Sequence, residues 1–224
     1  FGTINDYYIK NSSEKASLTG KDVGPYTLPG DIEKECEGVH RFEKGIVIAE
    51  EAIKAADKDV NFLEYSRIIF LTPYNNCHQD QGYIGKLEFE TLDGKIPVSV
   101  ALVSSIGLKV IGHELGHNFG VAHSNSKECI SCEPEEYGDW YSIMSSKGNT
   151  MHFNSAYKEA AGWPSNTITT TQGEYLLKPL EAQPIDGIQH IMLPLTDSYY
   201  SLNFRQPIDY DAGQSSKVYS EFLS

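Results

Sequence analysis

Apolar and polar positions in the first half of the chain follow three patterns, and each pattern predicts an element. Between Phe42 and Ala56, apolar residues recur every three or four positions among charged ones, which predicts an amphipathic helix. Residues 67–73 (RIIFLTP) form a short apolar run that is typical of a buried strand. Residues 83–92 and 95–103 flank Asp93-Gly94, a dipeptide that favours a tight hairpin turn. The patterns therefore predict a helix, a strand and a hairpin in that order.

Weaker patterns predict the remaining elements. Residues 3–11 fit either a short helix or an irregular arm, and residues 15–31 combine turn residues with β-prone pieces, which predicts a meandering β segment. Ser104-Ser105 is a candidate N-cap pair for a helix that follows it. Residues 154–164 predict a compact helix, with Asn154 or Ser155 as its cap and Gly162 in the left-handed conformation at its end.

This order of elements predicts an α/β (α+β) fold with a mixed twisted sheet. A long helix would back the sheet, a second helix would follow the hairpin, and a third would lie near residue 160. Beyond Trp163 the sequence changes to β-prone pieces separated by Pro, Gly and Asp. We therefore expect one domain at 1–164 and a small β-rich region at 165–224, whose completeness we leave open.

The composition and charge of the chain argue against nucleic acids and membranes as binding partners. The 224 residues include 18 basic and 31 acidic side chains, which gives a formal charge of −13. Such a surface repels phosphate backbones and anionic lipid, so we expect no binding to nucleic acid or membrane surfaces. No apolar run approaches the roughly 20 residues of a membrane span. The chain opens at Phe1 without a signal peptide, which we interpret as a processed or cloned fragment from which any targeting segment has been removed.

The four cysteines favour disulfides over free thiols. They are Cys36, Cys77, Cys129 and Cys132, which allow three ways of forming two bridges. Cys129 and Cys132 form a C-x-x-C pair, but a zinc knuckle needs two further ligands at matching spacing. We therefore expect disulfides and an oxidising compartment.

The stretch HELGHNFGVAH (113–123) contains the candidate chemistry. His113 and His117 are four residues apart, so on a helix both imidazoles lie on one face and can reach one metal ion. His123 lies six residues further, and on a continued helix it would turn about 120° away from that face and lie about 9 Å along the axis. Gly120 can end the helix because glycine adopts the left-handed conformation at little cost. The stretch thus predicts a zinc site with His113, His117 and His123 as ligands and an open position for water, as in catalytic sites.

The longer pattern H-E-x-x-H-x-x-G-x-x-H resembles the metzincin clan of zinc endopeptidases. The clan also has a methionine-bearing turn below the metal, and YSIMSS (141–146) offers Met144 for that place. Within the clan, HELGHNFGVAHS, YGDWYSIMSS and HFNSAYKEAAGW are most similar to the gametolysin (M11-type) family. KASLTGKDVGPYTLPG and LNFRQPIDYD are looser similarities.

This resemblance implies a metzincin-like catalytic domain and a secreted metalloendopeptidase that hydrolyses extracellular or cell-wall proteins. Glu114 would be the general base toward a zinc-activated water, and it would then protonate the leaving amine. Tyr141 and Ser145 are tentative residues of the pocket that follows the scissile bond. The substrate would add a strand along Tyr83–Glu90. Ser146 stands where astacins have a tyrosine ligand, so we expect none. We expect a protein or peptide substrate as the partner. We expect the oligomeric state to be a monomer.

Alternatives to this function remain open. A catalytically inactive zinc-binding module for adhesion or recognition is the main one, although such modules commonly lose the base that Glu114 retains. A zinc exopeptidase would need groups that hold a free chain terminus, and no such group is identified. Asp80 and Asp93 do not form an EF-hand loop, so no motif supports calcium. We interpret His152 as structural, and Asp139 as either a partner of a ligand histidine or a loop stabiliser.

Overall fold

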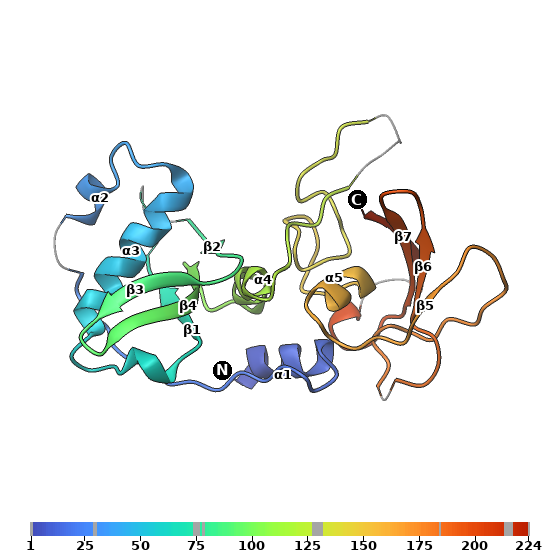
Figure 1. The fold of residues 1–224 in the computed structure, drawn as a ribbon, viewed down its shortest axis with the longest axis horizontal. Helices are drawn as coiled ribbons and strands as arrows, with labels where there is room; N and C mark the ends of the chain where they lie inside the picture. Colours follow the sequence, from blue (N-terminus) through green and yellow to red (C-terminus); the bar gives the residue numbers. More distant parts are fainter. Residues whose placement is uncertain are drawn as a thin grey trace. The chain divides into compact units, whose positions relative to one another are not determined.

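The computed structural model describes residues 2–28, 31–73, 77, 79–126, 132–183, 185–212 and the backbone of 217–223. The chain forms two compact units, the central unit (Thr19–Ala122) and the C-terminal unit (Phe1–Leu18 with His123–Ser224). Each unit contains helices and a mixed four-stranded sheet, so the α+β class is confirmed (Figure 1). The expected division into 1–164 and 165–224 concerns segments of sequence and stays a prediction.

The sheet of the central unit is built around one long strand, β4. The last half of β4 pairs in parallel with β1 and antiparallel with β2, and its first half pairs antiparallel with β3. Thr91 lies opposite Gly94, so the predicted hairpin and the mixed sheet are both confirmed. The elements of this unit are α2 (Ile32–Glu35), α3 (Arg41–Ala56), the short 3₁₀ helix η1 (Phe62–Glu64), β1 (Arg67–Leu71), β2 (Gln81–Gly82), β3 (Leu87–Thr91), β4 (Gly94–Val103) and α4 (Leu108–Asn118).

Helix α3 packs its apolar stripe against this sheet. Ile48 and Ile53 lie in one buried cluster with Val98, Val100 and Leu102 of β4. The predicted helix is confirmed, but its buried face begins later than the periodicity indicates. Phe42 is 61% exposed and stacks on the ring of His40. The first turn of α3 therefore projects beyond the apolar core.

Two expectations for the central unit are wrong. No helix or strand forms in residues 15–28, because Pro25 has no backbone donor and Tyr26 and Leu28 pack their side chains against the α3 cluster. Ser104 does not cap α4, whose N-cap is Gly107. The Ser104 N–H and hydroxyl instead donate to the Asp80 carboxylate, at 2.6 and 3.1 Å.

The C-terminal unit combines helices with a sheet of strand order β5-β6-β7-β8. β5 pairs in parallel with β6, and the other two pairs are antiparallel, so the β-rich character expected beyond residue 165 is confirmed. Residues 2–11 form a helix rather than an irregular arm. The elements are α1 (Gly2–Asn11), α5 (Ser155–Ala160), β5 (Thr167–Thr169), β6 (His190–Pro194), β7 (Tyr199–Arg205), the 3₁₀ helix η2 (Asp209–Asp211) and β8 (Lys217–Leu223).

The predicted caps of α5 are confirmed. The Asn154 side chain accepts the Tyr157 N–H at 2.8 Å, and Gly162 follows the helix with φ of 71°. Both ends of this short helix are thus set by local residues, as the sequence pattern predicts.

The cysteines are oxidised where the structure describes them. Cys36 and Cys77 form a disulfide in the central unit, and Cys132 is also disulfide-bonded. Cys129 lies outside the described residues. The Cys36–Cys77 bridge indicates an oxidising environment. None of the described helices has the length and apolar character that a membrane span requires.

Candidate metal centre

Helix α4 places His113 and His117 side by side. Their ring centroids are 5.0 Å apart, as expected for residues one helical turn apart. His117 is 7% exposed and its Nδ1 lies 2.7 Å from the Val121 carbonyl oxygen. A carbonyl oxygen can only accept a hydrogen bond, so Nδ1–H is the donor and Nε2 carries the lone pair that can ligate a metal.

The chain leaves α4 through a Schellman turn at Gly120. The Gly120 N–H donates to the His117 carbonyl at 2.9 Å, and the Val121 N–H donates to the Gly116 carbonyl at 3.2 Å. Gly120 has φ of 89°, a left-handed conformation that residues with a Cβ rarely adopt. The predicted role of Gly120 is confirmed, and the turn allows the segment after the helix to double back.

His113, His117 and His123 form a group that could hold a metal ion. One ring nitrogen of each lies within 4.8 Å of the other two. The Nδ1 of His123 lies 2.9 Å from the Glu136 carboxylate, a contact that orients the ring and again leaves Nε2 with the lone pair. Three neutral imidazoles are a donor set of catalytic zinc sites, so the residues fit the expected metal.

Further contacts hold His123 in place. Its ring lies against the Tyr137 ring in a tilted arrangement with centroids 3.8 Å apart, and its carbonyl accepts the Tyr157 hydroxyl at 2.8 Å. Neither Glu136, Tyr137 nor Tyr157 is recognisable from the motif, because each is at least 13 residues away in sequence. Asp139 accepts the Ser124 hydroxyl at 2.6 Å and the Tyr141 N–H at 2.8 Å, and both bonds stabilise the loop.

Glu114 lies beside the histidines on α4 and is only 6% exposed. Burial, together with the nearby Asp80 carboxylate, raises the pKa of Glu114 to about 8, while a hydrogen bond from Gly82 and the charge of Arg41 act in the opposite direction. A Cβ at Gly82 would lie 2.1 Å from the Glu114 carbonyl oxygen. Glycine at position 82 therefore lets the backbone of β2 lie directly against the helix at Glu114. Gly82 has no local sequence pattern that predicts this contact.

Met144 is fully buried next to the segment that follows His123. Its carbonyl accepts the Ser124 N–H at 2.8 Å, which ties the YSIMSS turn to that segment. Tyr141 is half-buried, and Ser145 is 1% exposed with its hydroxyl accepting the Lys147 N–H at 3.0 Å. The roles of Met144 as a Met-turn and of Tyr141 and Ser145 in substrate binding stay predictions.

Comparisons with known proteins do not place the chain in a family. No family model, no curated protein and no solved structure is matched significantly by this sequence.

Proposed function

We propose that this protein is a zinc metalloendopeptidase of the metzincin clan, most similar to the gametolysin family. The observation that carries the proposal is the grouping of His113, His117 and His123 at ligand distance, with Glu114 on the same helix as two of them. The Schellman turn at Gly120 supports it, because the turn explains the spacing of the third histidine.

Zinc is the metal that this donor set suits best, since imidazole is a preferred zinc ligand. When bound, zinc would polarise the scissile carbonyl and acidify water in the open position. Glu114 would accept a proton from the water molecule while the oxygen of that water bonds to the carbonyl carbon of the scissile peptide. Glu114 then delivers that proton to the amide nitrogen as the carbon–nitrogen bond breaks.

The substrate would bind as an extended strand along Tyr83–Glu90. Among the described strands, β3 pairs with β4 alone, so its other edge presents backbone donors and acceptors that a peptide can use. Replacing side chains of this segment should change substrate binding more than metal content. The oxidising environment indicated by the disulfide supports secretion and extracellular substrates.

The test is proteolysis by protein loaded with zinc. We expect cleavage of an unfolded protein substrate that stops when a chelator is added and returns with zinc. Glu114→Ala should lower kcat by about 10²–10⁴-fold while retaining one zinc per chain, because the base is lost and the ligands are not. Glu50→Ala, on the exposed side of α3, is the matched control and should cleave normally.

The opposite results are equally informative. A zinc-loaded protein that cleaves no peptide in a library would favour an inactive binding module. Release of single terminal residues would favour an exopeptidase. Loss of zinc from Glu114→Ala would contradict the role of Glu114 as a base that does not ligate the metal.

A further inference from the structure

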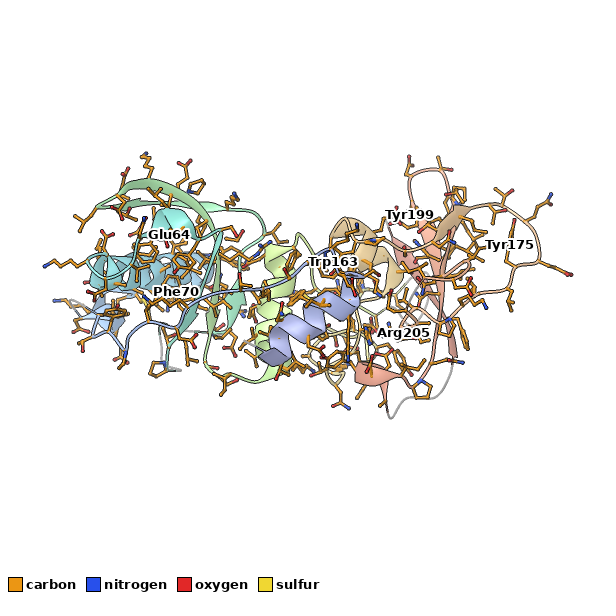
Figure 2. All side chains as sticks on the ribbon, turned by 90° about the horizontal axis from the view of Figure 1, so that it is seen from below. Glu64, Phe70, Trp163, Tyr175, Tyr199 and Arg205 are labelled. Carbon is orange, nitrogen blue, oxygen red and sulfur yellow. A yellow bond between two sulfur atoms is a disulfide. The ribbon has the colours of Figure 1, made fainter. Side chains whose placement is uncertain are left out.

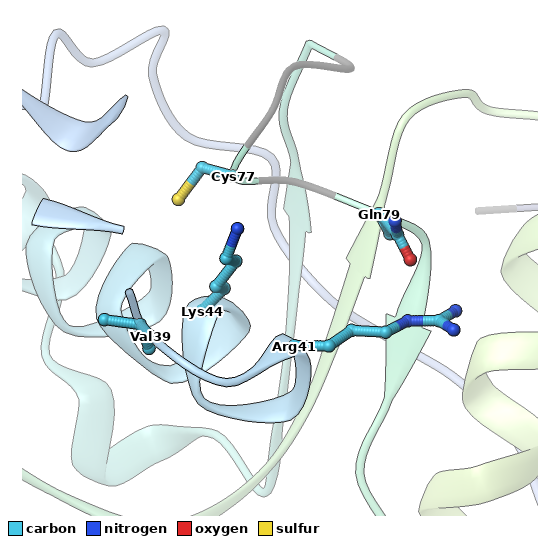
Figure 3. A pocket seen from close by; sticks show the side chains of 5 residues that line it. All are labelled: Val39, Arg41, Lys44, Cys77 and Gln79. Atoms are coloured by element: carbon cyan, nitrogen blue, oxygen red, sulfur yellow. The ribbon is translucent and has the colours of Figure 1, made fainter. Parts of the chain in front are cut away.

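A small basic pocket lies at the start of helix α3. It has a volume of about 190 Å³ and is lined by Val39, Arg41, Lys44, Cys77 and Gln79. Figure 3 shows the Arg41 and Lys44 side chains extending from the first turns of α3 beside Cys77 and Gln79. The chain carries 31 acidic and only 18 basic residues, so two cations in one pocket are a local reversal of its charge.

The start of α3, which lines the pocket, is bonded to the segment around β2 that lies against Glu114. The Phe42 carbonyl, next to Arg41, accepts the Tyr83 hydroxyl at 2.6 Å and the Gln81 side-chain N–H at 3.4 Å. These bonds tie the first turn of α3 to β2, and Gly82 of β2 lies against the Glu114 backbone. The first turn of α3, which carries Arg41, is therefore linked through β2 to the segment of α4 at Glu114.

Arg41 gains no evident stability from its position. Positive charges in the first turns of a helix interact unfavourably with the helix dipole. Arg41 is exposed and forms no ion pair within 4.0 Å among the described residues. A residue that weakens its own helix and lies close to the candidate catalytic base is better explained by binding.

We propose that this pocket is a subsite that binds a carboxylate of the peptide substrate. The inference rests on the proposed function, because the substrate would be a peptide that lies along Tyr83–Glu90. Arg41 offers a planar fork of donors to a carboxylate, and Lys44 adds a second positive charge. The apolar Val39 and the Cys77 side chain can contact the methylene groups of a glutamate. The carboxylate would come from an acidic side chain near the scissile bond or from the chain terminus.

The experiment compares peptides that differ only in a carboxylate. One series carries Glu or Gln at each position around the cleavage site, and the other ends in a free acid or an amide. The ratio of kcat/KM for the acid to that for its neutral partner should fall about 10- to 100-fold in Arg41→Gln, mainly through KM. Arg41→Glu should favour a Lys peptide over the Glu peptide. Lys54→Gln, at the other end of α3, should leave the ratio unchanged.

A binding measurement separates this inference from the proposed function. Fluorescent Glu and Gln peptides are titrated into the zinc-loaded Glu114→Gln protein, with and without Arg41→Gln. Preferential binding of the Glu peptide that depends on Arg41 supports the subsite even if no peptide is cleaved. Equal affinities in the presence of Arg41 overturn the subsite even if wild type is an active protease. A lowered melting temperature of Arg41→Gln with an unchanged selectivity ratio would assign Arg41 a structural role and overturn the inference.

Discussion

The central unit and the C-terminal unit bury different kinds of side chain. In the central unit the interior is a cluster of aliphatic and aromatic residues shared by α3 and the sheet. Its buried polar residues among those described are Ser99, Glu114, His117 and Asn118, and three of these belong to α4. In the C-terminal unit, charged and hydrogen-bonding side chains are buried together with aromatic rings such as Tyr7, Tyr8, Phe153 and Trp163.

Arg205, which is labelled in Figure 2, is ion-paired with two buried carboxylates of the C-terminal unit. It is 3% exposed, and its Nε lies 2.7 Å from both the Glu181 and the Asp211 carboxylates. Burial and the adjacent Asp211 raise the pKa of Glu181 to about 7. Although burial opposes it, the Arg205 charge holds the pKa of Asp211 below its ordinary value. The two carboxyl groups thus share one guanidinium in a dry environment.

The two interiors should respond differently to substitution. An apolar cluster loses stability in proportion to the volume removed, because each methyl group contributes separately. A buried charge cluster loses most of its stabilisation when any one member is removed, because the remaining charges stay buried without an opposite charge beside them. The predictions below test this contrast, beginning with the largest expected effect.

Arg205→Met should lower the free energy of unfolding of the C-terminal unit by about 3–5 kcal/mol, since it leaves Glu181 and Asp211 without their cation. Urea unfolding followed by tryptophan fluorescence measures this, because both tryptophans, Trp140 and Trp163, belong to the C-terminal unit. Arg205→Lys keeps the charge but not the fork of donors, so it should recover part of the loss. Equal losses in both variants would show that packing, not charge, matters at this position.

Ile53→Ala should cost the central unit about 3 kcal/mol, because Ile53 is 1% exposed at the middle of the apolar cluster. Ile53→Val removes one methyl group and should cost about 1 kcal/mol. Hydrogen exchange of peptides from β4 reports the change in this unit. A graded series supports the contrast with Arg205. If Ile53→Val lowered the stability of the central unit as much as Ile53→Ala does, the apolar interior would be as sensitive to a single substitution as the charged one.

A contrast between local and long-range interactions explains which parts of the structure can be predicted from the sequence. Helix α3, the Asp93-Gly94 hairpin and the exit at Gly120 depend on local patterns, and all three are confirmed. Glu136 beside His123 and Gly82 beside Glu114 depend on chain segments that meet only after folding, and neither has a local signature. The errors at residues 15–28 and at Ser104 have the same cause, because tertiary contacts replaced the local preference in both places.

The buried polar interior was the least predictable part. The Tyr7 hydroxyl donates to the Met151 carbonyl, and the Lys158 ammonium donates to the Leu180 carbonyl. Nothing in the sequence distinguishes Lys158 or Arg205 from surface cations, since periodicity identifies apolar faces and not charges that find partners far along the chain. The interpretation of His152 as a structural residue is consistent with its burial at 1% exposure.

His152 gives the smallest but most specific test of the charged interior. Neither of its ring nitrogens has a hydrogen-bond partner among the residues that the structure describes, and Asp211, Arg205, Lys158 and Lys10 act on it electrostatically. Burial, reinforced by Lys158, lowers the pKa of His152 from 6.5 to about 3. The neutral form is thus favoured in the folded state, while the unfolded chain takes up a proton near pH 6.5. The stabilisation is present above pH 6.5 and is lost as the pH falls toward 3.

Between pH 7.5 and pH 5 the wild type should therefore lose about 2 kcal/mol more than His152→Phe, which keeps an aromatic ring beside Tyr210 and cannot be protonated. Urea unfolding at the two pH values, followed by tryptophan fluorescence, gives both losses. The comparison uses differences with pH, so a change in packing that shifts His152→Phe equally at both values does not affect it. Parallel losses in the two proteins would mean that His152 gains a partner or solvent on protonation, and the C-terminal interior would then be less rigidly closed than its contacts indicate.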